Sequence, residues 1–213
     1  NLEMAKISKD GIIFYNLDGE EIQKEMKTIE WDAEAAEKAG FEHFMMKEIH
    51  EQPRAVKDTL NSVLKEGKFD LTDIGLSEED IRRTSQIYIV ACGSAYHVGM
   101  VAQYVIEDLV RIPVRVELAS EFRYRKPILD PNGLVIIISQ SGETADSLAA
   151  LRESKKQGVK TLGIVNVIGS SIAREADNVY YTLAGPEIAV ATTKAYSTQL
   201  IAAYTCLLYT SPS

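Results

Sequence analysis

Cysteine and histidine are scarce in this chain of 213 residues, which has two cysteines and three histidines. Cys92 and Cys206 lie far apart in the sequence. They do not form the closely spaced, even-numbered pattern of a disulfide framework, and they fit a reducing compartment such as the cytoplasm. His43, His50 and His97 fall on predicted helices without a cysteine or carboxylate at ligand spacing, so we expect no metal site.

Long apolar runs and an excess of positive charge are also missing. No apolar stretch reaches the ~18 residues of a membrane-spanning helix, and the chain does not begin with a signal peptide. The formal net charge is −8 and the basic residues do not cluster, so we expect neither a membrane span nor a nucleic-acid-binding surface. An acidic protein of this kind binds an anion only through a local arrangement of backbone N–H groups and hydroxyls.

Both ends of the sequence are unusual. Asn1 stands where a methionine is expected, and an apolar helical pattern runs into Tyr-Thr-Ser-Pro-Ser at residues 209–213. We expect the chain to be a fragment and these last residues to be a non-native tail. A genuine C-terminal turn is the alternative.

The first 84 residues contain short elements of several kinds. Residues 1–30 alternate as a β-hairpin with turns at Lys-Asp-Gly and Asp-Gly, and residues 30–40 read as a short charged helix or linker. The apolar spacing over 43–67 predicts two helices, the second beginning near Pro53. A further short helix is expected at Ser77–Arg83, with Ser77 as its N-cap.

The pattern then changes to strand, loop and helix in repetition over residues 85–208. The expected strands are 86–93, 114–120, 133–139, 159–167 and 178–184, and the expected helices are 97–110, 145–158, 170–176 and 193–208. Continuous Val, Ile and Leu strands alternating with helices indicate a parallel sheet covered on both faces. We therefore predict a three-layer, doubly wound α/β domain with five parallel strands, in which the first and third strands are neighbours.

The loop after the third strand is rich in hydroxyls. Ser139, Ser141 and Thr144 lie within six residues of one another, together with Gln140, and Gly142 allows the backbone to turn and a ligand to approach closely. A helix begins there, so its free N–H groups and positive dipole end face the same place. This combination predicts a phosphate-binding loop; the simpler alternative is that the hydroxyls only cap the helix.

Two other loops at strand ends carry candidate ligand groups. Gly93 and Ser94 follow the first strand, but the spacing is not G-x-G-x-x-G, and no Walker-type G-K-[ST] is present, which disfavours dinucleotides and nucleoside triphosphates. Thr192, Thr193 and Lys194 lie at the start of the last helix. Thr192 or Thr193 either caps this helix or contacts a ligand, and Lys194 pairs either with an acidic neighbour or with a phosphate.

Four stretches together resemble a known family: "ACGSAYHVGMVAQY", "ELASEFRYR", "SQSGETADSLAALRESK" and "EIAVATTKAYSTQ". They are similar to the first sugar isomerase (SIS) domain of the glutamine–fructose-6-phosphate aminotransferases, which make glucosamine 6-phosphate. Upstream, "HFMMKEIHEQP" resembles the segment that joins the glutaminase domain of that family to its isomerase part. The resemblance implies the end of a glutaminase domain and a linker at 1–40, linker helices at 41–84, and the first SIS domain at 85–208.

The resemblance also implies a function. Enzymes of that family transfer the amide nitrogen of glutamine to fructose 6-phosphate and isomerise the product to glucosamine 6-phosphate, without a metal or redox cofactor, as homodimers. By position, the residues implied to hold the sugar phosphate are Ser94, Ser139, Gln140, Ser141 and Thr144 at the phosphate and Val190 and Thr192 at the sugar hydroxyls, with Gly93, Gly142 and Lys194 as further candidates. The family usually has a second hydroxyl residue where this chain has Ala95. The catalytic groups of the family lie outside this segment, so we expect no catalytic residue here and no activity from the fragment alone.

Three other interpretations remain open at this stage. A sugar-phosphate sensor would share the hydroxyl-rich loop but needs a DNA-binding helix-turn-helix before it. A free-standing phosphosugar isomerase needs its own acid–base pair, for which Glu143 and His97 are the nearby candidates. A flavodoxin-like protein would carry its phosphate loop after the first strand rather than the third.

Overall fold

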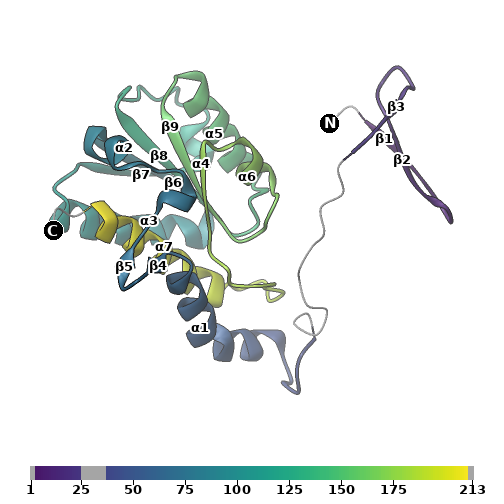
Figure 1. Ribbon diagram of the computed structural model, residues 1–213, viewed down its shortest axis with the longest axis horizontal. Coiled ribbons are helices and arrows are strands. Elements are labelled where there is room, and N and C mark those ends of the chain that lie inside the picture. The colour runs from purple at the N-terminus through teal and green to yellow at the C-terminus, as the bar shows by residue number, and fades with distance from the viewer. Residues whose placement is uncertain (1–2, 25–36, 211–213) are drawn as a thin grey trace. The chain divides into compact units, whose positions relative to one another are not determined.

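The computed structural model describes residues 3–24 and 37–210 (Figure 1). The chain divides into two compact units, residues 1–32 and 33–213. Most of the helix or linker predicted at 30–40 lies outside the described residues. Of the predicted tail, residues 209 and 210 belong to the last helix, and 211–213 lie outside the described part.

The first unit is a small antiparallel sheet. Its strands are β1 (Met4–Ser8), β2 (Gly11–Tyr15) and β3 (Glu21–Ile22), in the order β1-β2-β3. The pairing of Ser8 with Gly11 leaves a two-residue turn between the first two strands, which confirms the predicted hairpin. Ile7 and Ile12 are exposed, as expected for a sheet too small to enclose a core of its own.

The second unit is built on a five-stranded parallel sheet, which confirms the predicted fold class. Its strands are β6 (Gln86–Ala91), β7 (Val114–Leu118), β8 (Gly133–Ser139), β9 (Lys160–Val165) and β10 (Asn178–Tyr181). Their spatial order is β10-β9-β8-β6-β7, and β6 pairs in parallel with both β7 and β8. The chain therefore moves to one side of β6 and then to the other, so the direction of winding reverses between β6 and β8.

Helices cover both faces of this sheet (Figure 1). They are α3 (Gly93–Leu109), α4 (Ala119–Phe122), α5 (Ala145–Lys156), α6 (Ser171–Glu175) and α7 (Lys194–Thr210). On one face, Ile89 and Ile138 belong to the same buried cluster as Val98 of α3 and residues of α7. On the other face, Ile137 belongs to a cluster with Leu151 of α5 and residues of α4 and α6. Successive strand residues thus feed two separate cores, as their alternating direction requires.

The segment before the sheet differs from the prediction at Pro53. Instead of two helices, a single helix α1 (Phe44–Asn61) runs through this proline, so the predicted break was wrong. Proline has no N–H to give the carbonyl of Ile49 four residues earlier. The side-chain amide of Gln52 donates to that carbonyl at 3.2 Å, which replaces the missing hydrogen bond.

Short elements connect α1 to the sheet. They are β4 (Leu64–Lys65), β5 (Lys68–Phe69), the 3-10 turn η2 (Thr72–Ile74) and α2 (Glu78–Arg83). The predicted cap of α2 is confirmed: the Ser77 hydroxyl accepts from the Asp80 N–H, and the Asp80 carboxylate accepts from the Ser77 N–H. An ion pair with Lys160 of β9, together with the hydrogen bonds that the Ser77 hydroxyl and N–H donate to the Asp80 carboxylate, lowers the pKa of Asp80 to about 2.

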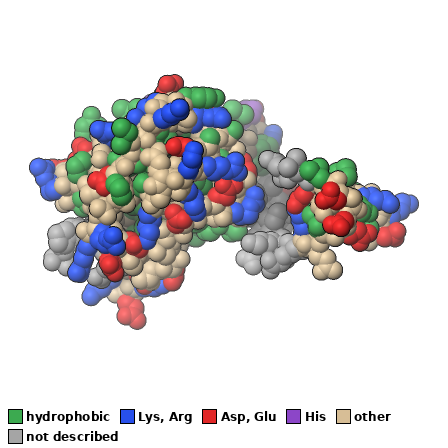
Figure 2. Space-filling view, turned by 90° about the horizontal axis from the view of Figure 1, so that it is seen from above, with side chains coloured by type: hydrophobic (Ala, Val, Ile, Leu, Met, Phe, Trp, Pro, Cys, Tyr) green, Lys and Arg blue, Asp and Glu red, His purple; other side chains and the backbone are tan. Residues whose placement is uncertain are grey.

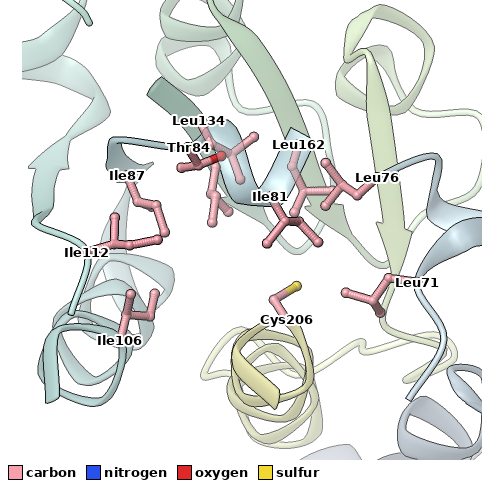
Figure 3. Close-up of a pocket in the computed structure, with 11 residues that line it drawn as sticks. Leu71, Leu76, Ile81, Thr84, Ile87, Ile106, Ile112, Leu134, Leu162 and Cys206 are labelled. Carbon is pink, nitrogen blue, oxygen red and sulfur yellow. The ribbon is translucent and has the colours of Figure 1, made fainter. Parts of the chain in front are cut away.

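A small apolar cavity of about 40 Å³ lies between α2, α3, α7 and the amino ends of the strands (Figure 3). Its lining is almost entirely Leu and Ile, including Leu71, Ile81 and Leu134, together with the thiol of Cys206. Burial raises the pKa of this thiol to about 12, so it stays protonated and behaves as a small apolar group. This cavity offers almost nothing to hold a charged ligand.

The surface carries charges of both signs. In the space-filling view, Lys and Arg side chains are interspersed with Asp and Glu (Figure 2). No helix in residues 3–24 and 37–210 is long and apolar enough to cross a membrane.

Candidate functional site

A polar cavity of about 260 Å³ lies at the carboxyl ends of β6 and β8. This is the place where the strand order reverses, which is the usual ligand position in open α/β sheets. Its lining residues are Cys92, Ser94, Ala95, Ile138, Ser139, Gln140, Ser141, Thr144, Thr192 and Gln199. None of them carries a charged side chain, so an anion bound here is held by dipoles and hydroxyls alone.

The hydroxyls of the loop after β8 support the turn of that loop. The Ser139 hydroxyl accepts from the Gly142 N–H at 3.1 Å, and it lies 3.0 Å from the hydroxyl of Thr144. The Ser141 hydroxyl accepts from the Glu143 N–H at 3.2 Å. Thr144 is the N-cap residue of α5 but makes no side-chain cap bond, so the simpler alternative, in which it only caps the helix, does not describe this hydroxyl.

These bonds leave protons available for a ligand. Because Ser141 accepts within the loop, its own O–H is free to donate outward. In the pair formed by Ser139 and Thr144, one hydroxyl donates to the other, and the second keeps a proton. The hydroxyl of Ser94 has no hydrogen-bond partner within 3–24 and 37–210. This end of the cavity is therefore rich in donors, which suits an acceptor-only group such as a phosphate.

Gly142 makes the tight turn of the loop possible. Its φ is +66°, in the left-handed region. A Cβ at this position would lie 2.1 Å from the hydroxyl oxygen of Ser170. The carbonyls of Gln140 and Gly142 accept from the N–H groups of Asn166 and Ile172, which directs them into the protein rather than toward a ligand.

Two helices begin at the cavity. The N-terminus of α3 supplies Ser94 and Ala95 to the lining, and α5 begins directly after Thr144. The first N–H groups of each helix lack intrahelical partners, and the dipoles place partial positive charge there. Because α3 starts at Gly93 rather than near residue 97 as predicted, Ser94 lies in its first turn. As expected, the adjacency of β6 and β8 brings this residue and Ser139 to one cavity.

The loop before α7 closes another side of the cavity with Thr192. The hydroxyl of Thr192 donates to Glu187 at 2.9 Å, and the same carboxylate accepts from the N–H groups of Thr193 and Ala195 at 2.8 and 3.1 Å. Glu187 therefore caps the N-terminus of α7. Its partners lie five to eight residues further along the chain, in the same irregular loop and in the first turn of α7, and the sequence analysis did not identify it.

The structure does not bring Val190 and Lys194 to the cavity lining. The side chain of Val190 is fully exposed. The ammonium of Lys194 is buried and donates to Glu51 of α1 at 2.6 Å. Pairing with an acidic neighbour, one of the two roles considered for Lys194, is thus the one that the structure contains.

Glu143 and His97 also lie outside the lining. Glu143 accepts from the Ser171 N–H at 2.7 Å, and hydrogen bonds from Ser171 lower the pKa of this carboxyl. His97 contacts the carbonyl of Gly93 through Nδ1 at 3.2 Å. Neither group is placed as an acid–base pair over the cavity, which removes the main argument for a free-standing isomerase.

Sequence reasoning missed one polar group of the lining, Gln199. This side chain is buried in α7, and its position as an amide in a mostly apolar helix was the available signal. No group of three or more His, Cys, Asp or Glu residues suited to a metal ion is found in the part of the chain that the structure describes.

The fold and the cavity define a doubly wound α/β domain with an uncharged, hydroxyl-rich cavity at the carboxyl ends of its strands, and comparisons with known proteins show its family. The SIS domain family matches residues 80–209. The chain belongs to this family.

Curated relatives narrow the resemblance. The chain is 56% identical over 208 residues to a protein of Clostridium tetani named glutamine–fructose-6-phosphate aminotransferase [isomerizing], which covers 97% of the chain and 34% of that relative. A protein of the same name from Clostridium acetobutylicum is 57% identical over 203 residues, covering 95% and 33%. The chain thus spans about a third of the length of these relatives.

Solved structures show the same likeness. The C-terminal domain of glucosamine-fructose-6-phosphate aminotransferase from Francisella tularensis matches with a TM-score of 0.79 at 44% identity, over 83% of this chain and 52% of that one. A glucosamine-6-phosphate deaminase from Thermotoga maritima matches with a TM-score of 0.62 at 26% identity, over 78% and 49%.

Proposed function

We propose that this chain is the fructose-6-phosphate-binding part of an isomerising glutamine–fructose-6-phosphate aminotransferase. The complete enzyme would transfer the amide nitrogen of glutamine to fructose 6-phosphate and isomerise the product to glucosamine 6-phosphate. In the cavity between β6 and β8, Ser94, Ser141 and the pair of Ser139 and Thr144 hold the phosphate, with the N-termini of α3 and α5 beside them.

One observation carries this proposal: in an uncharged cavity, Ser141 and one hydroxyl of the pair formed by Ser139 and Thr144 still have a proton to donate after the internal hydrogen bonds are counted. Such a site favours a phosphate monoester without requiring a cationic side chain. The sensor alternative predicted a helix-turn-helix before the sheet. In residues 37–85, α1 and α2 are instead separated by the β4-β5 hairpin and η2.

Calorimetric titration with fructose 6-phosphate tests the proposal. Ser141→Ala should weaken binding about tenfold, the equivalent of ~1.4 kcal/mol for one hydrogen bond to a charged acceptor. Ser171→Ala, a serine on α6 outside the cavity, is the matched control and should leave the affinity unchanged. Fructose without a phosphate should not compete. Equal binding by the Ser141→Ala variant and the unmodified chain would refute this use of the cavity.

We further propose that this segment alone does not catalyse the formation of glucosamine 6-phosphate. No acid–base pair faces the cavity in the described residues, so the remaining groups must come from other parts of the enzyme. The measurement is glucosamine 6-phosphate formation from ammonia and fructose 6-phosphate by the 213-residue chain. Robust turnover by this chain would contradict the proposal that other parts of the enzyme supply the acid–base groups.

A homodimer is the assembly that we propose for the complete enzyme. Met100, Val101 and Tyr104 of α3 are exposed, and a second copy would bury them. Sedimentation of the complete enzyme should show a dimer at micromolar concentration, and a monomer there would contradict the proposal.

A further inference from the structure

We infer that Glu187 is a positioning residue that decides which end of a sugar phosphate this cavity accepts at Thr192. The inference rests on the proposed function, since it concerns the same ligand. It assigns a role to a carboxylate that lies outside the lining and acts through a neighbour.

Glu187 is fully engaged by donors from its own loop and from α7. One oxygen, Oε2, accepts from the Thr192 hydroxyl at 2.9 Å. The other, Oε1, accepts from the N–H groups of Thr193 and Ala195 at 2.8 and 3.1 Å. Both oxygens serve as acceptors, which is the role of an ionised carboxylate at a helix N-terminus.

This arrangement fixes the hydrogen-bonding direction of Thr192. A threonine hydroxyl has a single proton, and here that proton points to Glu187. The oxygen of Thr192 therefore offers only lone pairs to the cavity that it lines. A phosphate is also acceptor-only, so it finds no donor there, whereas a sugar hydroxyl donates to Thr192 directly.

The negative charge of Glu187 also disfavours a phosphate at Thr192. Three helices begin around the cavity. Among the described residues, no side chain caps the N-terminus of α3 or of α5, and Asp146 in the first turn of α5 is paired with Arg123. The N-terminus of α7 already holds the carboxylate of Glu187, whose negative charge repels a second anion. The cavity is thereby polarised, with donors at Ser94 and Ser141 and an acceptor at Thr192.

The loop that carries Glu187 is held from outside the sheet by α1. Glu48 is buried, and its Oε1 accepts from the N–H groups of Ile188 and Ala189 at 2.6 and 3.2 Å. On the other side, the amide of Asn166 donates to the carbonyl of Gly185 at 2.7 Å. These anchors keep Glu187 between them in place, so the direction of the Thr192 proton does not depend on the ligand.

The test compares two probes, fructose 6-phosphate and inorganic phosphate, by competition NMR on the 213-residue chain. Glu187→Gln presents an amide to Thr192 and removes the negative charge. It should weaken the binding of fructose 6-phosphate about tenfold. The binding of inorganic phosphate should stay unchanged or become tighter. Thr192→Val should weaken the binding of fructose 6-phosphate but not that of inorganic phosphate. Thr192→Ser keeps the hydroxyl and should bind fructose 6-phosphate with unchanged affinity.

Glu79→Gln is the matched control, because it makes the same carboxylate-to-amide change at an exposed residue of α2 that does not line the cavity. It should leave both affinities unchanged. If the Glu187→Gln variant lost affinity for both probes in parallel, so that the ratio of the two affinities stayed unchanged, the inference would be overturned while the proposed function stayed intact. Failure of the unmodified chain to bind either probe at millimolar concentration would overturn both.

Discussion

The conformation of Gly142 leaves no space for a side chain. Its φ is +66°, and an added Cβ would lie 2.1 and 2.5 Å from the hydroxyl oxygen and Cβ of Ser170. Gly142→Ala should therefore displace the loop, cost ~2–4 kcal/mol of unfolding free energy and abolish fructose 6-phosphate binding. Urea unfolding and titration calorimetry measure the two effects.

Gly93 provides the matched control for that substitution. Its φ of +57° is also left-handed, but nothing lies within 4 Å of an added Cβ. Gly93→Ala should cost only the backbone preference, about 1–2 kcal/mol. If both substitutions were equally damaging, the close approach of Ser170 would not be the reason for glycine at position 142.

Ala95 marks a position where the cavity can gain a donor. It lies in the first turn of α3 and lines the cavity. The glutamine–fructose-6-phosphate aminotransferases, which the sequence resembles, usually have a hydroxyl residue at this position. Ala95→Ser should tighten fructose 6-phosphate binding about tenfold, since a hydrogen bond to a charged group contributes ~1.5–3 kcal/mol and part of it is spent ordering the side chain. An unchanged affinity would mean that a water or backbone N–H already fills this role.

At this scale the sequence predicts which residues meet but not how they are bonded. The cluster of Ser139, Ser141 and Thr144 was visible because a strand end and a helix start fix it locally. The direction of each hydroxyl proton depends on neighbours such as Glu187, which lies in an irregular loop without periodicity. For the same reason, the partner of Lys194 was not predictable.

Among the elements, α1 shows how a helix passes through a proline. Gln52 donates to the carbonyl of Ile49 that Pro53 leaves unpaired, and its oxygen accepts from Ser197 of α7 at 2.6 Å. Gln52→Ala should lower the unfolding free energy by about 1–2 kcal/mol, because it removes both bonds.

A double-mutant cycle separates the two roles of Gln52. In a Pro53→Ala background the backbone N–H restores the bond to Ile49, so the cost of Gln52→Ala should fall by ~0.5–1 kcal/mol. Thermal or urea unfolding of the four proteins gives the coupling. Strict additivity would show that the side-chain amide does not replace the missing bond.

The elements of the sheet were predictable because their signals are local. Continuous apolar runs marked β6, β8 and β9, and the serine cap marked α2. The break at Pro53 was wrong because a side chain, rather than the backbone, satisfies the freed carbonyl. The hairpin of β4 and β5 has only two residues in each strand, too few for a periodic pattern.

For the whole molecule, acid stability depends on ion pairs between elements. Asp80 of α2 has its pKa lowered to about 2, first by Lys160 of β9 and then by Ser77. A carboxyl with a lowered pKa stabilises the fold above its unfolded pKa of about 4, and this contribution is lost as pH falls toward 2. Asp80→Asn should therefore cost ~1 kcal/mol at pH 7, a value reduced for partial exposure, and less at pH 3.

Urea unfolding at both pH values checks this difference. Glu79→Gln is the control, because its exposed carboxylate lies 3.9 Å from Arg83 within the same helix and should matter little at either pH. An equal cost of Asp80→Asn at pH 7 and pH 3 would contradict the assignment of the ion pair.

Contacts across the whole chain were beyond sequence reasoning. Glu48 of α1 holds the N–H of Ile188, 140 positions later, and Lys194 meets Glu51 across a similar distance in sequence. No local pattern records such pairs. The contacts of Glu48 and Glu51 explain why α1, which precedes the sheet, matters for the cavity. This helix positions the loop that carries Thr192.

The account rests on where the ligand binds, and amide NMR of the 213-residue chain titrated with fructose 6-phosphate measures this directly. We predict saturable shifts of the N–H signals of Ser94, Ser141 and Gly142, with no change at Leu71 and Ile81 beside the apolar cavity. Shifts centred on the apolar cavity, or none in the loop that follows β8, would contradict it.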